Sequence, residues 1–156
     1  MDVDVTTEIV IDRPRTEVAA YACDPDHATE WYANITAVRW KSPKPLAVGS
    51  LVEFTAKFLG RRLVYTYDIA EFVPGIRLVM RTADGPFPMV TTYEFADAGA
   101  DATNMTLRNL GVPGGFARIA ARGMERAMRS ANEKDLKRLK AVLEASPGRR
   151  SGRTAP

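Results

Sequence analysis

Five side chains with hydroxyl or amide groups fall at alternating positions in segments that have the pattern of β-strands: Tyr65, Tyr67, Thr91, Tyr93 and Asn109. Each shares its expected strand face with apolar residues, so the five should converge on one apolar surface. Sparse polar groups on an apolar wall are typical of a small-molecule pocket, and such donors can also stabilise an enolate oxygen. The alternative for each tyrosine is a buried ring whose hydroxyl simply reaches water.

Motifs for catalysis or metal binding are otherwise weak. A single histidine, His27, and a single cysteine, Cys23, almost exclude a zinc site of the usual nitrogen and sulfur type. The glycine-rich segment 111–115 lacks the Lys-Ser/Thr pair of a phosphate-binding loop, and no GxSxG or HExxH motif occurs. Glu53 and Asp68 fall on the outer strand face, where they cannot form a buried acid–base pair. We therefore expect no metal and no cofactor, and assign no catalytic residue.

The positive charge of the chain is concentrated at its C-terminal end. The isoelectric point is about 9.2, yet residues 1–115 hold 11 Lys and Arg against 15 Asp and Glu. Residues 146–156 hold three arginines and no acid, and are rich in Pro, Gly and Ser. We therefore predict a folded domain over 1–145 and a disordered basic tail over 146–156. The tail is interpreted as solubilising, with a weak polyanion contact as the alternative.

A second group of basic residues recurs at helical spacing opposite an apolar face: Arg118, Arg122, Arg126 and Arg129. No aromatic residue alternates with these arginines, so we interpret the stripe as a solvated helix face and expect no nucleic-acid partner.

The cellular setting follows from three simple features. The first residues are acidic and contain no apolar run, so no signal peptide is expected. No stretch approaches the roughly 18 apolar residues of a membrane span. A lone cysteine fits a reducing compartment. These features predict a cytoplasmic protein.

The elements that position the polar groups can be placed along the chain by periodicity. Alternation over 3–12 predicts a strand, and Pro14 and Asp24-Pro25 open two short helices. Six further strands, separated by short turns, are expected between Ile35 and Val112, and short links join antiparallel neighbours. A long helix is expected from Phe116 to Glu144. The predicted class is α+β, with a seven-stranded antiparallel sheet curved around this helix.

The long helix changes character along its apolar face. Small residues and methionines come first, including Ala120, Met124 and Met128, whereas branched residues such as Leu136 and Leu139 follow. At about 3.6 residues per turn the stripe rotates by about 100° between the halves, which predicts a bend near 131–133 or a local bulged turn. Small side chains would leave a cavity under the first half. Close approach to the sheet, with strand aromatics filling the space, is the alternative.

The expected cavity wall combines the inward strand residues with the first half of the helix: Phe54, Phe58, Tyr65, Tyr67, Met89, Thr91, Tyr93, Asn109, Phe116, Ala120, Met124 and Met128. The turns at 58–62 and 84–88 and the segment 111–115 would form its mouth.

A set of short motifs is spread over most of the chain: Ile9-x-Ile11-x-x-Pro14-x-x-x-Val18, Asp24-Pro25 ahead of Trp31, Val48-Gly49, Glu71-x-x-Pro74 and the ending Leu136-Lys137-x-Leu139-Lys140-x-x-Leu143-Glu144. Together these motifs resemble those of the START-like (SRPBCC) superfamily, and more narrowly its polyketide cyclase/dehydrase and lipid-transport branch. The resemblance spans about Val3 to Glu144. It implies the helix-grip fold, a deep apolar cavity, and ligands such as lipids, sterols or polyketides. Catalytic residues differ between branches of this superfamily, so none is carried over.

Three functions remain open from the sequence. The first is a protein that binds a small hydrophobic molecule in the cavity. The second is a cyclase, dehydratase or isomerase acting on a polyketide-like substrate, with Tyr67, Tyr93 and Asn109 as acid or oxyanion partners. The third is a protein-interaction module that uses the outer sheet face or the arginine stripe. A homodimer is compatible with each of them.

Overall fold

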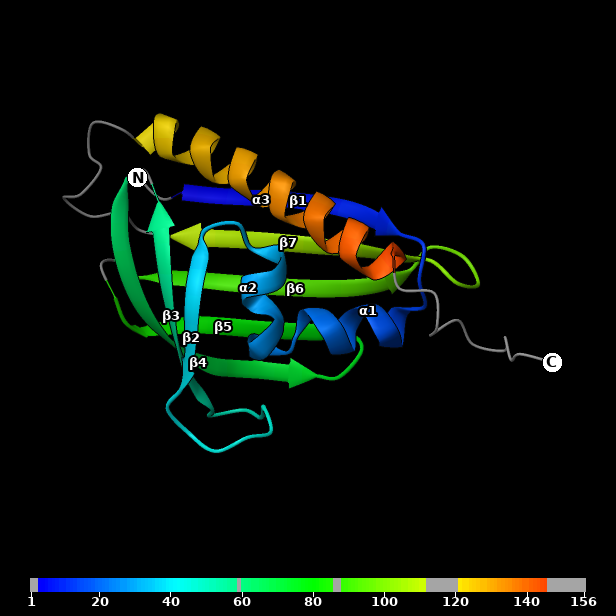
Figure 1. Ribbon diagram of the computed structural model, residues 1–156, viewed down its shortest axis with the longest axis horizontal. Coiled ribbons are helices and arrows are strands. Elements are labelled where there is room, and N and C mark those ends of the chain that lie inside the picture. The colour runs from blue at the N-terminus through cyan, green and yellow to red at the C-terminus, as the bar shows by residue number, and fades with distance from the viewer. Residues whose placement is uncertain (1–2, 59, 86–87, 112–120, 146–156) are drawn as a thin grey trace.

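The alternating segments form seven strands in the part of the chain that the structure describes. The computed structural model describes residues 3–58, 60–85, 88–111 and 121–145. The strands are β1 (Val3–Ile11), β2 (Ile35–Trp40), β3 (Leu51–Phe58), β4 (Arg61–Val73), β5 (Arg77–Asp84), β6 (Met89–Asp97) and β7 (Thr103–Gly111). They form one antiparallel sheet in the order β1-β7-β6-β5-β4-β3-β2 (Figure 1). The predicted sheet is confirmed.

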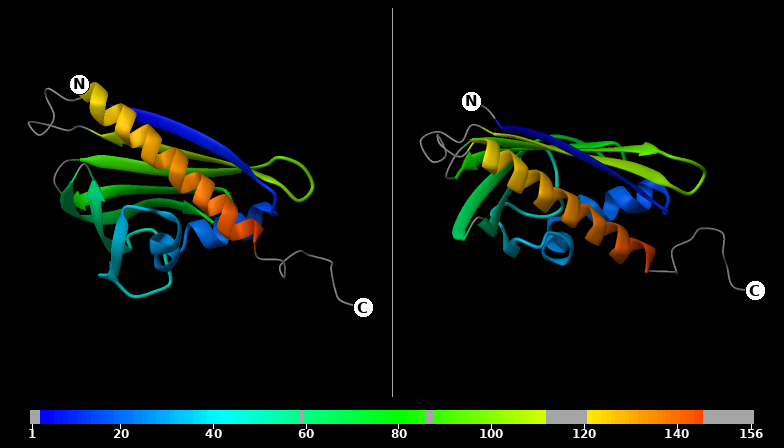
Figure 2. Two further views of the ribbon diagram at one scale, coloured as in Figure 1. Left: turned by 45° about the horizontal axis from the view of Figure 1, so that its top comes forward. Right: turned by 90° about the horizontal axis from the view of Figure 1, so that it is seen from above.

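The sheet curves because its longest strand is irregular. β4 has 13 residues, and its register against β5 shifts between Thr66 and Tyr67 and again between Ile69 and Glu71. Such bulges bend a strand and increase its twist. As a result β2 and β3 run steeply across the direction of β5, β6 and β7 (Figure 1). The β2–β4 end of the sheet turns toward the side that carries the helices (Figure 2).

The two short helices after β1 are also confirmed. Pro14 precedes α1 (Arg15–Ala22) and its carbonyl accepts from Val18 N at 3.0 Å. Asp24 caps the 3₁₀ turn Pro25–His27 by accepting from Asp26 N at 3.0 Å, and α2 (Ala28–Trp31) follows directly. The pair covers part of the concave face that α3 leaves open (Figure 1).

The last helix, α3 (Ala121–Glu144), has one continuous buried face. That face consists of Met124, Met128, Asn132, Asp135, Leu136, Leu139 and Leu143. The predicted rotation of the stripe, and with it the bend, is not found. The rotation came from counting small residues such as Gly123, which is exposed, and Ala127, which is half-buried, as part of the buried face. The residues that are buried are one to four positions apart and share one side of a continuous helix, so no bend is needed. Residues 112–120, where the helix was predicted to begin, lie outside the described residues.

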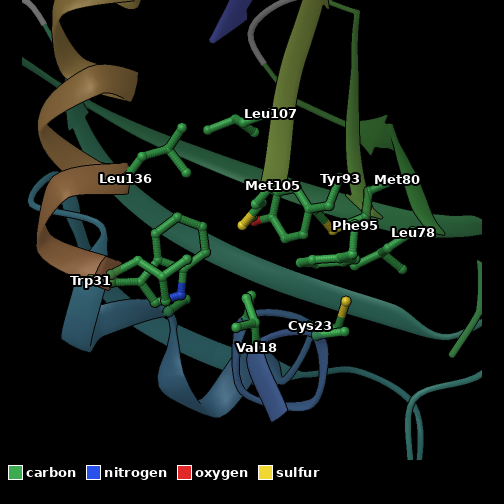
Figure 3. Close-up of a cluster of buried hydrophobic side chains, with 14 of the residues drawn as sticks. Val18, Cys23, Trp31, Leu78, Met80, Tyr93, Phe95, Met105, Leu107 and Leu136 are labelled. Atoms are coloured by element: carbon green, nitrogen blue, oxygen red, sulfur yellow. The ribbon is translucent and has the colours of Figure 1, made fainter. Parts of the chain in front are cut away.

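The core is closed at the C-terminal end of α3. Figure 3 shows Trp31 beside Leu136, with Tyr93 and Met105 of the sheet facing them. Trp31, Met105 and Leu139 are fully buried. Arg13 Nη2 donates to the Glu144 carbonyl at 2.8 Å, and Glu144 Oε2 accepts from Asp12 N at 2.8 Å. These bonds hold the helix end against the turn that follows β1.

Among the described residues, none of the helices is both long enough and apolar enough to pass through a lipid bilayer.

Candidate functional site

A cavity of about 140 Å³ lies between the concave face of the sheet, the two short helices and the middle of α3. Most of its lining is apolar: Ala22, Cys23, Pro25, Ala28, Ile35, Leu46, Val52, Phe54, Ala56, Leu63, Ile69, Leu78, Met80, Met89, Met128 and Ala131. An engineered apolar cavity of about 150 Å³ in another protein admits benzene. The space therefore admits at least a ring-sized guest, and it is partly open to solvent.

Most of the residues expected from the sequence lie on this wall. The cavity is lined by Phe54, Tyr65, Tyr67, Met89, Thr91, Tyr93, Asn109 and Met128. Met124 is buried elsewhere, in a cluster with Val3 and Val5 of β1, so its expected place in the wall is corrected. The helix crosses β1 at that point, and the cavity faces the next turns instead. Phe116, Ala120 and the side chain of Phe58 lie outside the described residues.

Sequence reasoning missed polar residues of α3 and of the segment between α2 and β2. The cavity is also lined by Asn132 and Asp135 of α3 and by Tyr32 and Asn34, which follow α2. Asn132 and Asp135 were left out because an amide and a carboxylate in a helix normally face solvent. Their spacing from Met128 was the available signal: positions 128, 132 and 135 fall on one helix face.

The hydroxyls of Tyr32 and Tyr93 are hydrogen-bonded to each other across the cavity, at 2.6 Å. Tyr32 also stacks against Trp31, with ring centroids 4.1 Å apart. Burial is the main cause that raises the pKa of both hydroxyls far above the ordinary value of 10. Both therefore remain neutral phenols at physiological pH, able to donate or accept a hydrogen bond.

Tyr67, Thr91 and Asn109 form a second polar group on the sheet. Thr91 and Asn109 are direct partners in the β6–β7 register, and Thr91 Oγ1 donates to Asn109 Oδ1 at 2.6 Å. Tyr67 Oη contacts the sulfur of Met89 at 3.6 Å. Burial raises the pKa of Tyr67 to about 12. This hydroxyl can donate a proton or hydrogen bond, but it cannot serve as a base near neutral pH.

Asp135 is a buried carboxylate on the cavity wall. It is 3% exposed, and its Oδ1 accepts from Ala33 N at 3.0 Å. Burial raises the pKa of this carboxyl from 3.8 to about 6, although the Ala33 amide and Arg138 act in the opposite direction. Asn132, one turn earlier, is 4% exposed, and its Nδ2 has no hydrogen-bond partner among the described residues.

The surroundings of His27 and Cys23 fit a structural role for both side chains. The His27 ring stacks on Tyr21 with centroids 4.1 Å apart, and its Nδ1 contacts the Tyr21 carbonyl at 3.1 Å. Cys23 is buried at the cavity wall, and burial raises the pKa of its thiol to about 12. A thiol with this pKa is a poor nucleophile.

A curved antiparallel sheet closed by a long C-terminal helix, with a cavity between them, is the helix-grip fold of the START-like superfamily. The chain belongs to the family described as polyketide cyclase / dehydrase and lipid transport, whose sequence model matches residues 2–144. Membership supports a role in binding a hydrophobic ligand or in cyclisation chemistry. No curated protein matches the sequence.

Solved structures share the fold at low sequence identity. The Zhui aromatase/cyclase of Streptomyces sp. R1128 aligns with a TM-score of 0.81 at 14% identity, covering 96% of this chain and 99% of that one. A protein of Thermus thermophilus aligns with a TM-score of 0.79 at 19% identity, covering 92% and 99%. A START superfamily protein of Mycobacterium smegmatis aligns with a TM-score of 0.76 at 13% identity, covering 91% and 97%. At these identities the likeness shows the fold alone.

Proposed function

We propose that the protein binds a small hydrophobic molecule, such as a lipid, a sterol or a polyketide-like compound, in the cavity between the sheet and α3. The observation that carries the proposal is the cavity itself. Its walls are mainly apolar side chains of the five strands β2 to β6 and of α1, α2 and α3, with a smaller number of polar residues among them. Close-packed interiors leave few voids larger than a water molecule, so a cavity of about 140 Å³ supports the binding of a ligand.

The size of the cavity bears on the length of the ligand. A ring comparable to an aromatic side chain would bury roughly 150–250 Å², which is worth roughly 4–6 kcal/mol of transfer free energy. The translational and rotational entropy that the ligand loses on binding offsets several kcal/mol of this gain. A single ring would therefore bind weakly, and a tighter ligand should extend through the open side of the cavity.

The turn after β5 begins beside the cavity wall at Tyr65. A Cβ atom at Gly85 would lie 2.6 Å from Tyr65 Cδ1, so this turn lies directly against a residue of the cavity wall. The turn 84–88 was predicted to border the mouth; residues 86 and 87 lie outside the described residues. The proposal also includes a cytoplasmic location and no nucleic-acid partner, which the acidic balance of residues 1–115 supports.

A cavity-filling substitution tests the proposal. Ala131 lines the cavity from α3, whereas Ala141 is exposed on the same helix. Ala131→Trp should abolish binding of the neutral fluorescent probe N-phenyl-1-naphthylamine, and Ala141→Trp should bind it like the wild type. Circular dichroism establishes that both variants fold, and Ala131→Phe serves if the tryptophan is not accommodated. Equal probe affinity in all folded variants would overturn the proposal.

A second candidate is a cyclase or dehydratase that uses the same cavity. It is favoured by the neutral phenols of Tyr67 and Tyr93, which can donate to a developing oxyanion, and by Asp135, whose raised pKa suits proton transfer. Tyr67→Phe combined with Tyr93→Phe should then abolish turnover of a polyketide-like substrate while probe binding persists. Undiminished turnover in the double variant would dismiss these two assignments.

A further inference from the structure

One hydrogen-bond donor on the cavity wall has no protein partner among the described residues. It is Nδ2 of Asn132, and its side chain is buried on the face of α3 that lines the cavity. A buried amide that lacks a partner destabilises a protein, so such groups are rare unless a ligand or water completes them. Asn132 lies on the cavity wall, and an acceptor on a guest that reaches this amide would complete its hydrogen bond.

An acceptor stands next to this donor. Asp135 follows Asn132 by three residues, so the two side chains lie on the same helix face. Asp135 Oδ1 accepts from Ala33 N. A carboxylate has about four acceptor positions on its two oxygens, so Asp135 retains capacity for a second donor. The pair thus offers one donor and one acceptor side by side.

The charges of the wall limit what can use this pair. Among the described residues that line the cavity, Asp24 and Asp135 are acidic, and no Lys, Arg or His is present. Arg138, the cation that acts on Asp135, donates to the Glu30 carbonyl in an exposed position. An anionic ligand group would therefore be desolvated without a countercharge and would lie near the Asp135 carboxylate.

We propose that the cavity selects a neutral ligand whose apolar body carries a hydroxyl or keto group bound by Asn132 and Asp135, and that it disfavours carboxylates. This inference rests on the proposed function and names the ligand class for the same site. A ligand hydroxyl accepts from Asn132 Nδ2 and donates to Asp135. A ligand ketone accepts from Asn132 alone. The expected order of preference is hydroxyl, ketone, unsubstituted ring, carboxylate.

Ring-matched probes test this order. The affinities of naphthalene, 2-naphthol and 2-naphthoate are measured by fluorescence for the wild type, Asn132→Leu and the matched control Asn104→Leu. Asn104 donates its amide to Glu8, away from the cavity. The ratio of 2-naphthol to naphthalene affinity should fall about 5- to 10-fold in Asn132→Leu, the loss expected for one hydrogen bond. The ratio should be unchanged in Asn104→Leu.

The acidic half of the pair is tested by pH. Among the residues that the structure describes, the titratable or charged groups that act on Asp135 are Arg138 and Tyr32, and neither changes its charge between about pH 5.5 and pH 8. Over this range 2-naphthoate stays ionised. Its affinity for the wild type should rise about 5-fold or more as Asp135 becomes protonated at the lower pH, and its affinity for Asp135→Asn should stay level.

The outcomes separate the two proposals. If naphthalene itself does not bind the wild type, the proposed function fails and the inference fails with it. If naphthalene binds but the 2-naphthol ratio is the same in Asn132→Leu and the wild type, only the inference is overturned. A 2-naphthoate affinity without pH dependence in the wild type overturns the assigned role of Asp135.

Discussion

The replacement of Asp135 by asparagine should stabilise the protein at neutral pH. Asparagine has the same shape, and its Oδ1 can still accept from Ala33 N, which lies 3.0 Å from the carboxylate oxygen. The change removes the charge that folding buries. Because burial raises the pKa of Asp135 from 3.8 to about 6, the ionised carboxylate is less favourable in the folded protein than in the unfolded chain.

The sign of the pH dependence follows from the direction of this shift. Below about pH 3 the carboxyl is protonated in both states, so it has no electrostatic effect on folding. Between about pH 3 and pH 6 the unfolded chain loses its proton first, and the folded state loses stability as the pH rises. Above about pH 6 the destabilisation is constant. The shift corresponds to an upper limit of about 3 kcal/mol, and we expect about 1–2 kcal/mol because the cavity leaves some solvation.

Urea unfolding of both proteins between about pH 3 and pH 8 measures this effect. Asp135→Asn should be about 1–2 kcal/mol more stable than the wild type at about pH 7.5, and the difference should vanish near about pH 3. Glu133→Gln is the matched control, because it removes an exposed carboxylate from the same helix. It should change stability by less than about 0.5 kcal/mol at either pH. An Asp135→Asn variant that is less stable than the wild type at neutral pH would refute the reasoning.

Three further predictions concern the core and the cavity wall. Leu139 is fully buried, so Leu139→Ala should lower the free energy of unfolding by about 2–5 kcal/mol in urea titrations. The control Lys134→Ala, at an exposed position, should lower it by less than about 0.5 kcal/mol. A loss below about 1 kcal/mol in Leu139→Ala would contradict the packing at the closed end. Cys23 should react with iodoacetamide far more slowly in the folded protein than in urea, because burial raises its thiol pKa to about 12, and equal rates would argue against that burial. In Gly85→Ala the new Cβ would lie 2.6 Å from the Tyr65 ring, so the ring should move and the affinity for a neutral probe should change. Unaltered probe affinity and stability would argue against this close approach.

The strands and their order of appearance could be predicted from the sequence because their pattern is local. Alternation places Tyr65 and Tyr67, or Thr91 and Tyr93, on one face whatever the rest of the chain does. The curvature of the sheet was inferred only from the need to cover one apolar face with one helix. Its actual cause, the bulges in β4, depends on pairing with β5 and leaves no clear trace in the residues themselves.

The place of the cavity along α3 was harder to predict. Small residues such as Ala120 suggested a space under the first turns, but Met124 is packed against Val3 and Val5. That contact depends on where the helix crosses β1, which is a tertiary property. The cavity lies under Met128, as predicted, and Ala131, and it extends to Asn132 and Asp135, where two polar residues interrupt the apolar stripe.

The interruption itself carries information about function. A helix that only had to cover a sheet would be more stable with leucines at positions 132 and 135, because burying an amide and a carboxylate is unfavourable. Their presence on a buried face conflicts with the local rule that decides the rest of the stripe, and such conflicts are expected where a site has been built into a core. The two buried polar residues that interrupt the apolar stripe are therefore the ones that we expect a ligand to contact.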